Sequence, residues 1–218
     1  MFSSDSDYQS YRGRFDQDQF EGEGVLTWKS GSVYEGSFVQ FKFSGRGRLT
    51  TNQNTIEGEF KNGELVNSKE TRFANGDKYV GQVSDRHLHG QGIYEYSCGS
   101  RFAGNFISGV KDDSSAKLLL ATEIGEMAYI GEVKDELMTG KATLTSKTTA
   151  IEGVFEDNYL QGHAKITLLR KGILTGEFNE NMKHGEFEFK REDSGRKSTS
   201  YFQYDVEDSS KTNLSVRF

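Results

Sequence analysis

The chain has no proline and one cysteine, and its 218 residues contain no long apolar segment. The lone Cys98 excludes an intramolecular disulfide and fits a reducing compartment. A transmembrane helix needs an apolar run of about 18 residues, and no such run is present. The N-terminal stretch MFSSDSDYQS lacks the basic and apolar regions of a signal peptide. The net charge of −6 argues against nucleic acid as a partner.

Glycine and aromatic residues are abundant, and they recur at fixed offsets. An aromatic or aliphatic residue stands two places before a glycine, as in Tyr11-Gly13-Phe15. Eight such units start at Tyr11, Tyr34, Ile56, Tyr79, Phe102, Tyr129, Ile151 and Leu174, with steps of 23, 22, 23, 23, 27, 22 and 23 residues. This regularity indicates a repeat protein. A degenerate ninth unit, Phe202 to Val206, is interpreted as a cap.

The second half of each unit carries a Gly-x-Gly element, such as Gly22-Glu23-Gly24 or Gly45-Arg46-Gly47. Side chains alternate between the two faces of a strand, so the glycines and aromatic residues of both halves share one face. Each unit is therefore predicted to be a β-hairpin with a Gly/aromatic face and a polar face. The glycines would leave room for neighbouring rings to lie over the backbone.

The two strands of each hairpin are expected to be joined by a polar loop of about six residues, such as 16–21. One apolar residue in each loop is expected to fill the space between consecutive hairpins: Phe20, Phe43, Leu65, Leu88, Met138 and Leu160. Side-by-side stacking predicts an all-β fold, an elongated single-layer antiparallel sheet that twists into a curved plate. The expected organisation is a flexible tail at 1–10, one array of about eight repeats plus the cap at 11–206, and a tail at 207–218.

The sequence shows no clear signature of phosphate binding, metal binding or catalysis. The Gly-x-Gly elements enter strands, whereas a phosphate-binding loop precedes a helix. His87 and His89 could share a face as metal ligands, but no cysteine or carboxylate set completes a site. No catalytic constellation stands out, and the residues after Val206 are too few for an enzyme domain. We therefore expect no enzyme activity, no cofactor and no metal. The altered third unit (67–69) and the longer fifth unit are expected to disturb the sheet locally, the fifth as a longer hairpin or as a partner contact.

The repeats resemble the MORN repeat family. Tyr34-Glu35-Gly36-Ser37-Phe38 is close to its Tyr-Glu-Gly-x-Trp/Phe segment, and the stretches 87–92 and 183–185 resemble its His-Gly-x-Gly loop ends. The resemblance covers residues 11–206. It implies a MORN-repeat solenoid acting as a non-enzymatic scaffold in the cytoplasm, within a cytoskeletal or axonemal (ciliary) assembly.

The Gly/aromatic face is the candidate binding surface, since a single-layer sheet has no second layer to cover it. We call it the aromatic trough, lined by Tyr11, Phe15, Trp28, Tyr34, Phe38, Tyr79, Tyr94, Tyr96, Phe102 and Tyr129. The expected partner is another protein, bound through an amphipathic helix or peptide. Exposed edge strands would also allow a homodimer. The alternative function is a membrane-surface adaptor for anionic phospholipid headgroups. A third is a regulatory module of an enzyme complex.

Overall fold

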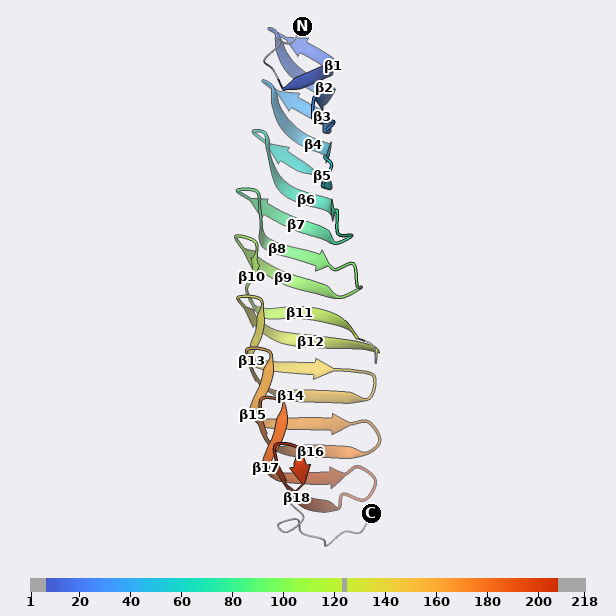
Figure 1. The fold of residues 1–218 in the computed structure, drawn as a ribbon, viewed down its shortest axis with the longest axis vertical. Helices are drawn as coiled ribbons and strands as arrows, with labels where there is room; N and C mark the ends of the chain where they lie inside the picture. Colours follow the sequence, from blue (N-terminus) through green and yellow to red (C-terminus); the bar gives the residue numbers. More distant parts are fainter. Residues whose placement is uncertain (1–6, 123–124, 208–218) are drawn as a thin grey trace. The chain divides into compact units, whose positions relative to one another are not determined.

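A computed structural model describes residues 7–122 and 125–207 of the chain. These residues form nineteen β-strands and no helix. The described residues divide into two compact units, one up to residue 110 and the other from residue 111, and in both units consecutive strands pair antiparallel (Figure 1). The predicted all-β fold of hairpins is confirmed.

Unit 1 contains nine strands that follow one another in sequence and in space. Its strands are β1 (Tyr8–Asp16), β2 (Gln19–Trp28), β3 (Val33–Val39), β4 (Lys42–Thr50), β5 (Asn54–Lys61), β6 (Glu64–Phe73), β7 (Lys78–Ser84), β8 (His87–Glu95) and β9 (Arg101–Ile107). Each strand pairs with the next from β1–β2 to β8–β9. In Figure 1, β1 lies at one end of this unit.

The short strand β10 (Val110–Lys111) contains the boundary between the two units. In unit 2 the strands again follow one another in sequence and in space. Its strands are β11 (Asp113–Thr122), β12 (Gly125–Lys134), β13 (Leu137–Thr145), β14 (Thr149–Glu156), β15 (Tyr159–Leu168), β16 (Gly172–Asn179), β17 (Met182–Arg191), β18 (Lys197–Gln203) and β19 (Val206–Glu207). Each strand again pairs with its successor. The fifth repeat is indeed longer, because its second half contains the short strand β10 as well as the 10-residue strand β11.

Two-residue turns join the strands of each hairpin, so the expected six-residue loops are wrong. In the first hairpin, Gln17 and Asp18 have φ values of 45° and 63°. Two consecutive positive φ angles are the mark of a type I′ turn, whose twist matches that of the flanking strands. Phe20 and Phe43, placed in loops from the sequence, lie in β2 and β4 after these turns.

The tips of successive hairpins are joined by main-chain hydrogen bonds. The N–H of Phe41 donates to the carbonyl of Phe20 at 3.2 Å, and the N–H of Gly63 donates to the carbonyl of Phe43 at 2.9 Å. Asn158 and Asn181 repeat this pattern in unit 2 with Met138 and Leu160. Stacking of the repeats is therefore supported by backbone groups that the turns would otherwise leave unpaired.

The two glycines of each Gly-x-Gly element have different structural roles. The first, such as Gly45 at φ 61°, lies in a β-bulge where the pairing of β3 with β4 skips two residues. A positive φ favours glycine there. The second belongs to a cross-strand row of small residues through unit 1: Gly13, Gly24, Gly36, Gly47, Gly58, Ser68, Gly81, Gly92 and Gly104. Ala116, in the irregular fifth repeat, takes the equivalent place opposite Gly131.

Departures from the expected boundaries occur at both ends. The first strand starts at Tyr8, inside the segment expected to be a tail, because Tyr8 pairs with Trp28. The last strand ends at Glu207, the first residue of the expected C-terminal tail. The remaining parts of the two tails, 1–6 and 208–218, lie outside the described residues, as does Glu123 of the fifth repeat. The third repeat has the expected irregularity, with register shifts on both sides of β6.

Candidate functional site

The aromatic trough is not an open surface along its whole length. Five of its ten residues are buried, with at most 1 % of their surface exposed: Tyr34, Phe38, Tyr79, Phe102 and Tyr129. A partner cannot contact them without opening the sheet, so their assignment to a binding surface is wrong. They form the core of the repeats instead.

Each buried tyrosine is held by the backbone of its own hairpin. The ring of Tyr34 lies over the second glycine of the element, and a Cβ added at Gly47 would come within 2.3 Å of the Tyr34 hydroxyl oxygen. That hydroxyl donates to the carbonyl of Ser37 at 3.2 Å, next to the bulge. Tyr79 and Tyr129 donate in the same way to Gln82 and Glu132, each at 2.7 Å.

Burial raises the pKa of the three phenols, Tyr34, Tyr79 and Tyr129, to about 12. Their rings also pack on neighbouring repeats. Tyr34 stacks on Phe43 of its own hairpin, with ring centres 3.7 Å apart, and meets Phe60 of the next repeat edge-on at 5.2 Å. Ring packing thus compensates for the low strand preference of glycine.

The open part of the Gly/aromatic face lies at the other end of the hairpins, where connecting turns join one repeat to the next. There Trp28 ends β2, Phe73 ends β6, and Tyr94 and Tyr96 lie at the end of β8; all four are partly exposed. We call these four residues the open aromatic row. Tyr94 contacts both Phe73 (ring centres 5.8 Å apart) and Tyr96 (4.8 Å). Phe73 was missed from sequence, although alternation from Thr71 puts it on this face.

The remaining two trough residues, Tyr11 and Phe15, belong to the edge strand β1 and are half-buried and exposed, respectively. Their rings meet edge-on at 5.1 Å, and Tyr11 stacks on Phe20 at 3.9 Å. These two residues do not belong to the open aromatic row. The trough residues therefore fall into three sets: the buried core, the open aromatic row and the edge strand.

One buried carboxylate organises the open aromatic row. Asp77 Oδ2 accepts hydrogen bonds from the Tyr94 hydroxyl at 2.7 Å and from the Asn75 amide at 2.8 Å. Asp77 Oδ1 accepts the main-chain N–H of Ser97 at 2.8 Å. The bonds from Tyr94 and then Ser97 hold the pKa of Asp77 below its usual value, and burial together with Asp77 raises the pKa of Tyr94.

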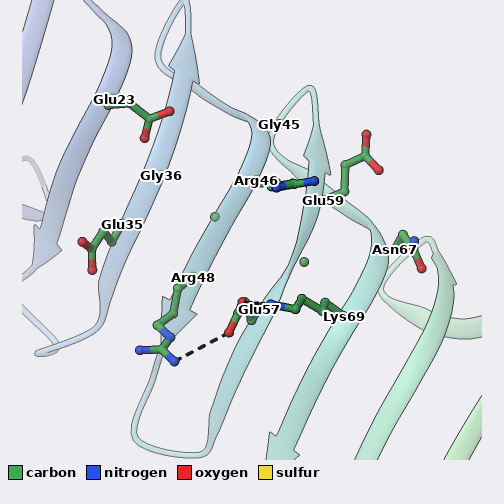
Figure 2. Close-up of a pocket in the computed structure, with 12 residues that line it drawn as sticks. Glu23, Glu35, Gly36, Gly45, Arg46, Arg48, Glu57, Glu59, Asn67 and Lys69 are labelled. Atoms are coloured by element: carbon green, nitrogen blue, oxygen red, sulfur yellow. Dashed lines mark hydrogen bonds and ion pairs between the residues drawn. The ribbon is translucent and has the colours of Figure 1, made fainter.

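The polar face of unit 1 has a shallow hollow above the glycine row (Figure 2). Charged side chains from β2 to β6 surround it: Glu23, Glu35, Arg46, Arg48, Glu57, Glu59 and Lys69. Glu57 lies between Lys69 at 2.7 Å and Arg48 at 3.6 Å. These two cations lower the pKa of Glu57, the Lys69 hydrogen bond contributing most. Arg48, Glu57 and Lys69 thus form one group of ion-paired side chains on this face.

The described residues show no group of three or more His, Cys, Asp or Glu side chains that could hold a metal ion. His87 and His89 are both exposed on β8. Within the ranges 7–122 and 125–207 there is also no helix long and apolar enough to cross a membrane.

Comparison with known proteins supports the repeat assignment. The family model described as "MORN repeat" matches residues 11–33, 79–101 and 175–186. A search of curated proteins found no match. The three matched segments cover the first repeat, the fourth repeat and part of the eighth, in register with the hairpins described above. Repeats of this kind occur in protein-binding and membrane-binding modules, and their all-β fold is typical of non-enzymatic scaffold proteins. The chain therefore contains MORN repeats at three places along its array of hairpins.

Proposed function

We propose that the protein is a non-enzymatic protein-interaction scaffold, and that an amphipathic helix or peptide of another protein binds its open aromatic row. The observation that carries this proposal is the partial exposure of Trp28, Phe73, Tyr94 and Tyr96 on one face of unit 1. Large aromatic side chains with a polar tip are the residues most enriched at the centres of protein interfaces. The proposed binding surface is thus the accessible part of the aromatic trough rather than its full length.

The preorganisation of the row supports the same function. Tyr94 is fixed by Asp77 and packs between Phe73 and Tyr96, so little side-chain entropy remains to be lost on binding. The apolar face of a helix would cover the rings, while the Tyr96 hydroxyl could bond to polar groups at its margin. A cytoskeletal or ciliary assembly in the cytoplasm is the proposed setting, on the basis of the family resemblance.

Site-directed photo-crosslinking in the native cell tests this proposal. A photoreactive benzoylphenylalanine replaces Tyr96 in one variant and Trp28 in another, and mass spectrometry identifies the crosslinked proteins. Both variants should capture the same partner. The matched control carries the crosslinker at Tyr159, an aromatic residue that is 49 % exposed in unit 2. Capture of the same proteins from position 159 would contradict the open aromatic row as the binding surface.

A membrane-surface function makes a different prediction. Binding to anionic lipid needs a basic patch, but Arg48, Lys69 and Lys165 each form an ion pair with a glutamate. Flotation with vesicles containing phosphatidylserine, compared with neutral vesicles, separates the two functions. Salt-sensitive flotation with the anionic vesicles alone would favour the lipid adaptor over the protein scaffold.

A further inference from the structure

We infer that the free edge of β1 is a docking site for an acidic β-strand of the pattern apolar-Glu-Gly-Glu-aromatic, which would extend the sheet of unit 1 by one strand. This surface differs from the open aromatic row, so the inference does not rest on the proposed function. Three features of β1 carry it: a backbone edge that none of the described strands pairs with, an exposed aromatic ring and an Arg-Gly-Arg triplet.

Among the residues that the structure describes, β1 pairs with β2 along one edge, and no strand pairs with its other edge. An edge strand presents a row of N–H and C=O groups that a further strand can satisfy. Addition of an extended peptide to such an edge is a common mode of recognition.

The aromatic side of this edge is also incomplete. Phe15 is 56 % exposed, whereas its equivalents Phe38 and Phe106, in the second and fifth repeats, are 1 % exposed. Phe38 has strands β2 and β4 on its two sides, whereas among the described residues Phe15 has a neighbouring strand on one side alone. An apolar residue on an added strand would cover Phe15 and remove this exposed ring from water.

The charges on β1 specify what the added strand should carry. Its Arg12-Gly13-Arg14 triplet has the same sequence as Arg46-Gly47-Arg48 in β4. In the sheet, β4 pairs with the Glu57-Gly58-Glu59 triplet of β5: Arg46 opposite Glu59, Gly47 opposite Gly58, and Arg48 opposite Glu57. Figure 2 shows this pair of strands, with Arg48 directed at Glu57.

The two triplets are equivalent in the face that their arginines occupy, although β4 carries a bulge at Gly45, beside its triplet, and β1 carries none within its own triplet. A half-turn in the plane of the sheet superposes β1 on β4, with the arginines on the same face and β2 in the place of β3. The free edge of β1 then takes the place of the edge of β4 that binds β5. Arg12 and Arg14 are exposed, and neither forms an ion pair with the described residues. Both are therefore available to face two glutamates.

The same charges disfavour a second copy of this chain. If two β1 strands paired about Gly13, Arg12 of each copy would face Arg14 of the other. Like charges directly opposite each other destabilise an antiparallel pair, and basic residues on an edge strand are a known protection against such pairing. The edge thus discriminates between a basic strand and an acidic one.

The test measures binding of a fluorescein-labelled peptide with the sequence of residues 54–61, NTIEGEFK, to the full chain by fluorescence anisotropy. The wild-type protein should bind this peptide and not its charge-reversed form, NTIRGRFK. The Arg12→Glu, Arg14→Glu double variant should bind NTIEGEFK about tenfold more weakly and should gain affinity for NTIRGRFK. A matched control reverses two exposed lysines of unit 2, Lys134→Glu and Lys147→Glu, and should bind as the wild type does.

Two further measurements use the wild-type protein alone, so they hold even if the double variant does not fold. The first uses two N-methylated forms of NTIEGEFK, one methylated at the glycine and the other at both glutamates. Alternate N–H groups of a strand face its neighbour, so methylation should abolish binding in one of these two peptides and leave it intact in the other. Bound peptide should also slow amide exchange in residues 8–16.

Several results would overturn the inference. They are an absence of binding at millimolar peptide, equal binding of both charge forms, and exchange protection confined to other strands. A dimer in sedimentation that dissociates on Phe15→Ser would overturn it too, since the edge would then be occupied by a second copy.

Discussion

The phenol of Tyr94 donates a 2.7 Å hydrogen bond to Oδ2 of Asp77, a carboxylate that is only 7 % exposed. This bond links β8 to the connecting turn before β7 and fixes a ring of the open aromatic row. Because Asp77 Oδ1 also accepts the N–H of Ser97, one side chain holds two successive connecting turns together.

Replacement of Asp77 should therefore loosen this part of unit 1. We expect Asp77→Ala to lower the free energy of unfolding by about 1–3 kcal/mol at neutral pH, since three charge-assisted hydrogen bonds are lost. Urea denaturation followed by circular dichroism measures this. The pKa of Asp77 is lowered in the folded state, so its contribution is complete above its unfolded pKa of about 4 and disappears as the pH falls through the folded value. A difference from wild type that grows in acid would contradict this role.

The buried tyrosines predict a loss of stability in alkali. The pKa of Tyr79 is raised from 10.0 to about 12 by burial. Its stabilising contribution is present below pH 10 and is lost as the pH rises towards 12, because the unfolded chain ionises first. Tyr79→Phe should cost about 1 kcal/mol at neutral pH, from the lost bond to the Gln82 carbonyl, and should lose less stability than wild type above pH 10. Tyr159→Phe, at an exposed position, should leave neutral stability unchanged.

The two glycines of one Gly-x-Gly element should respond in opposite ways to substitution. Gly45 has a φ of 61° and would meet nothing closer than 3.6 Å with a Cβ, so Gly45→Asn should be tolerated, since asparagine adopts this conformation readily. A Cβ at Gly47 would overlap the Tyr34 hydroxyl. We expect Gly47→Ala to cost about 1–3 kcal/mol. Thermal unfolding of both variants checks the contrast, which equal melting temperatures would contradict.

A tip turn offers a stabilising change. Asp85 and Arg86 form a two-residue turn with φ values of 50° and 65°. Arg86→Gly should raise the free energy of unfolding by about 1 kcal/mol, because glycine adopts the left-handed conformation without the penalty of a Cβ. Arg86→Ala keeps that penalty and serves as the control. The melting temperature should rise for glycine and not for alanine; a fall with glycine would show that the Arg86 side chain itself stabilises the turn.

Much of the fold could be predicted from the period and alternation of the sequence. The spacing from Tyr11 to Tyr34 set the length of a hairpin, and alternation placed Tyr34, Gly36 and Phe38 on one face. Turn geometry could not be predicted in the same way. Gln40 and Phe41 are not the usual residues of a type I′ turn, and the bulge at Gly45, which shifts the register by two residues, has no signature apart from the glycine itself.

The candidate surface was only partly predictable. Alternation identifies the face on which a side chain lies, and it correctly put Tyr79 and Tyr94 on the same one. It does not say how many neighbours cover each ring. Tyr79 lies over the small residues Gly81 and Gly92 and is buried, whereas Tyr94 lies one strand further on and stays partly open. Exposure depends on these cross-strand neighbours.

The sequence by itself determined the repeat, the strands and the polar and aromatic faces, because these follow from local periodicity, and its motifs gave the resemblance to MORN repeats. Only the tertiary structure decided which aromatic residues are core and which are surface. It also showed that Arg12-Gly13-Arg14 lies on an edge with which no described strand pairs, while the identical triplet at 46–48 is already paired with glutamates. The physical reason is that burial and pairing are properties of neighbouring strands, and the chain must be folded before a residue has those neighbours.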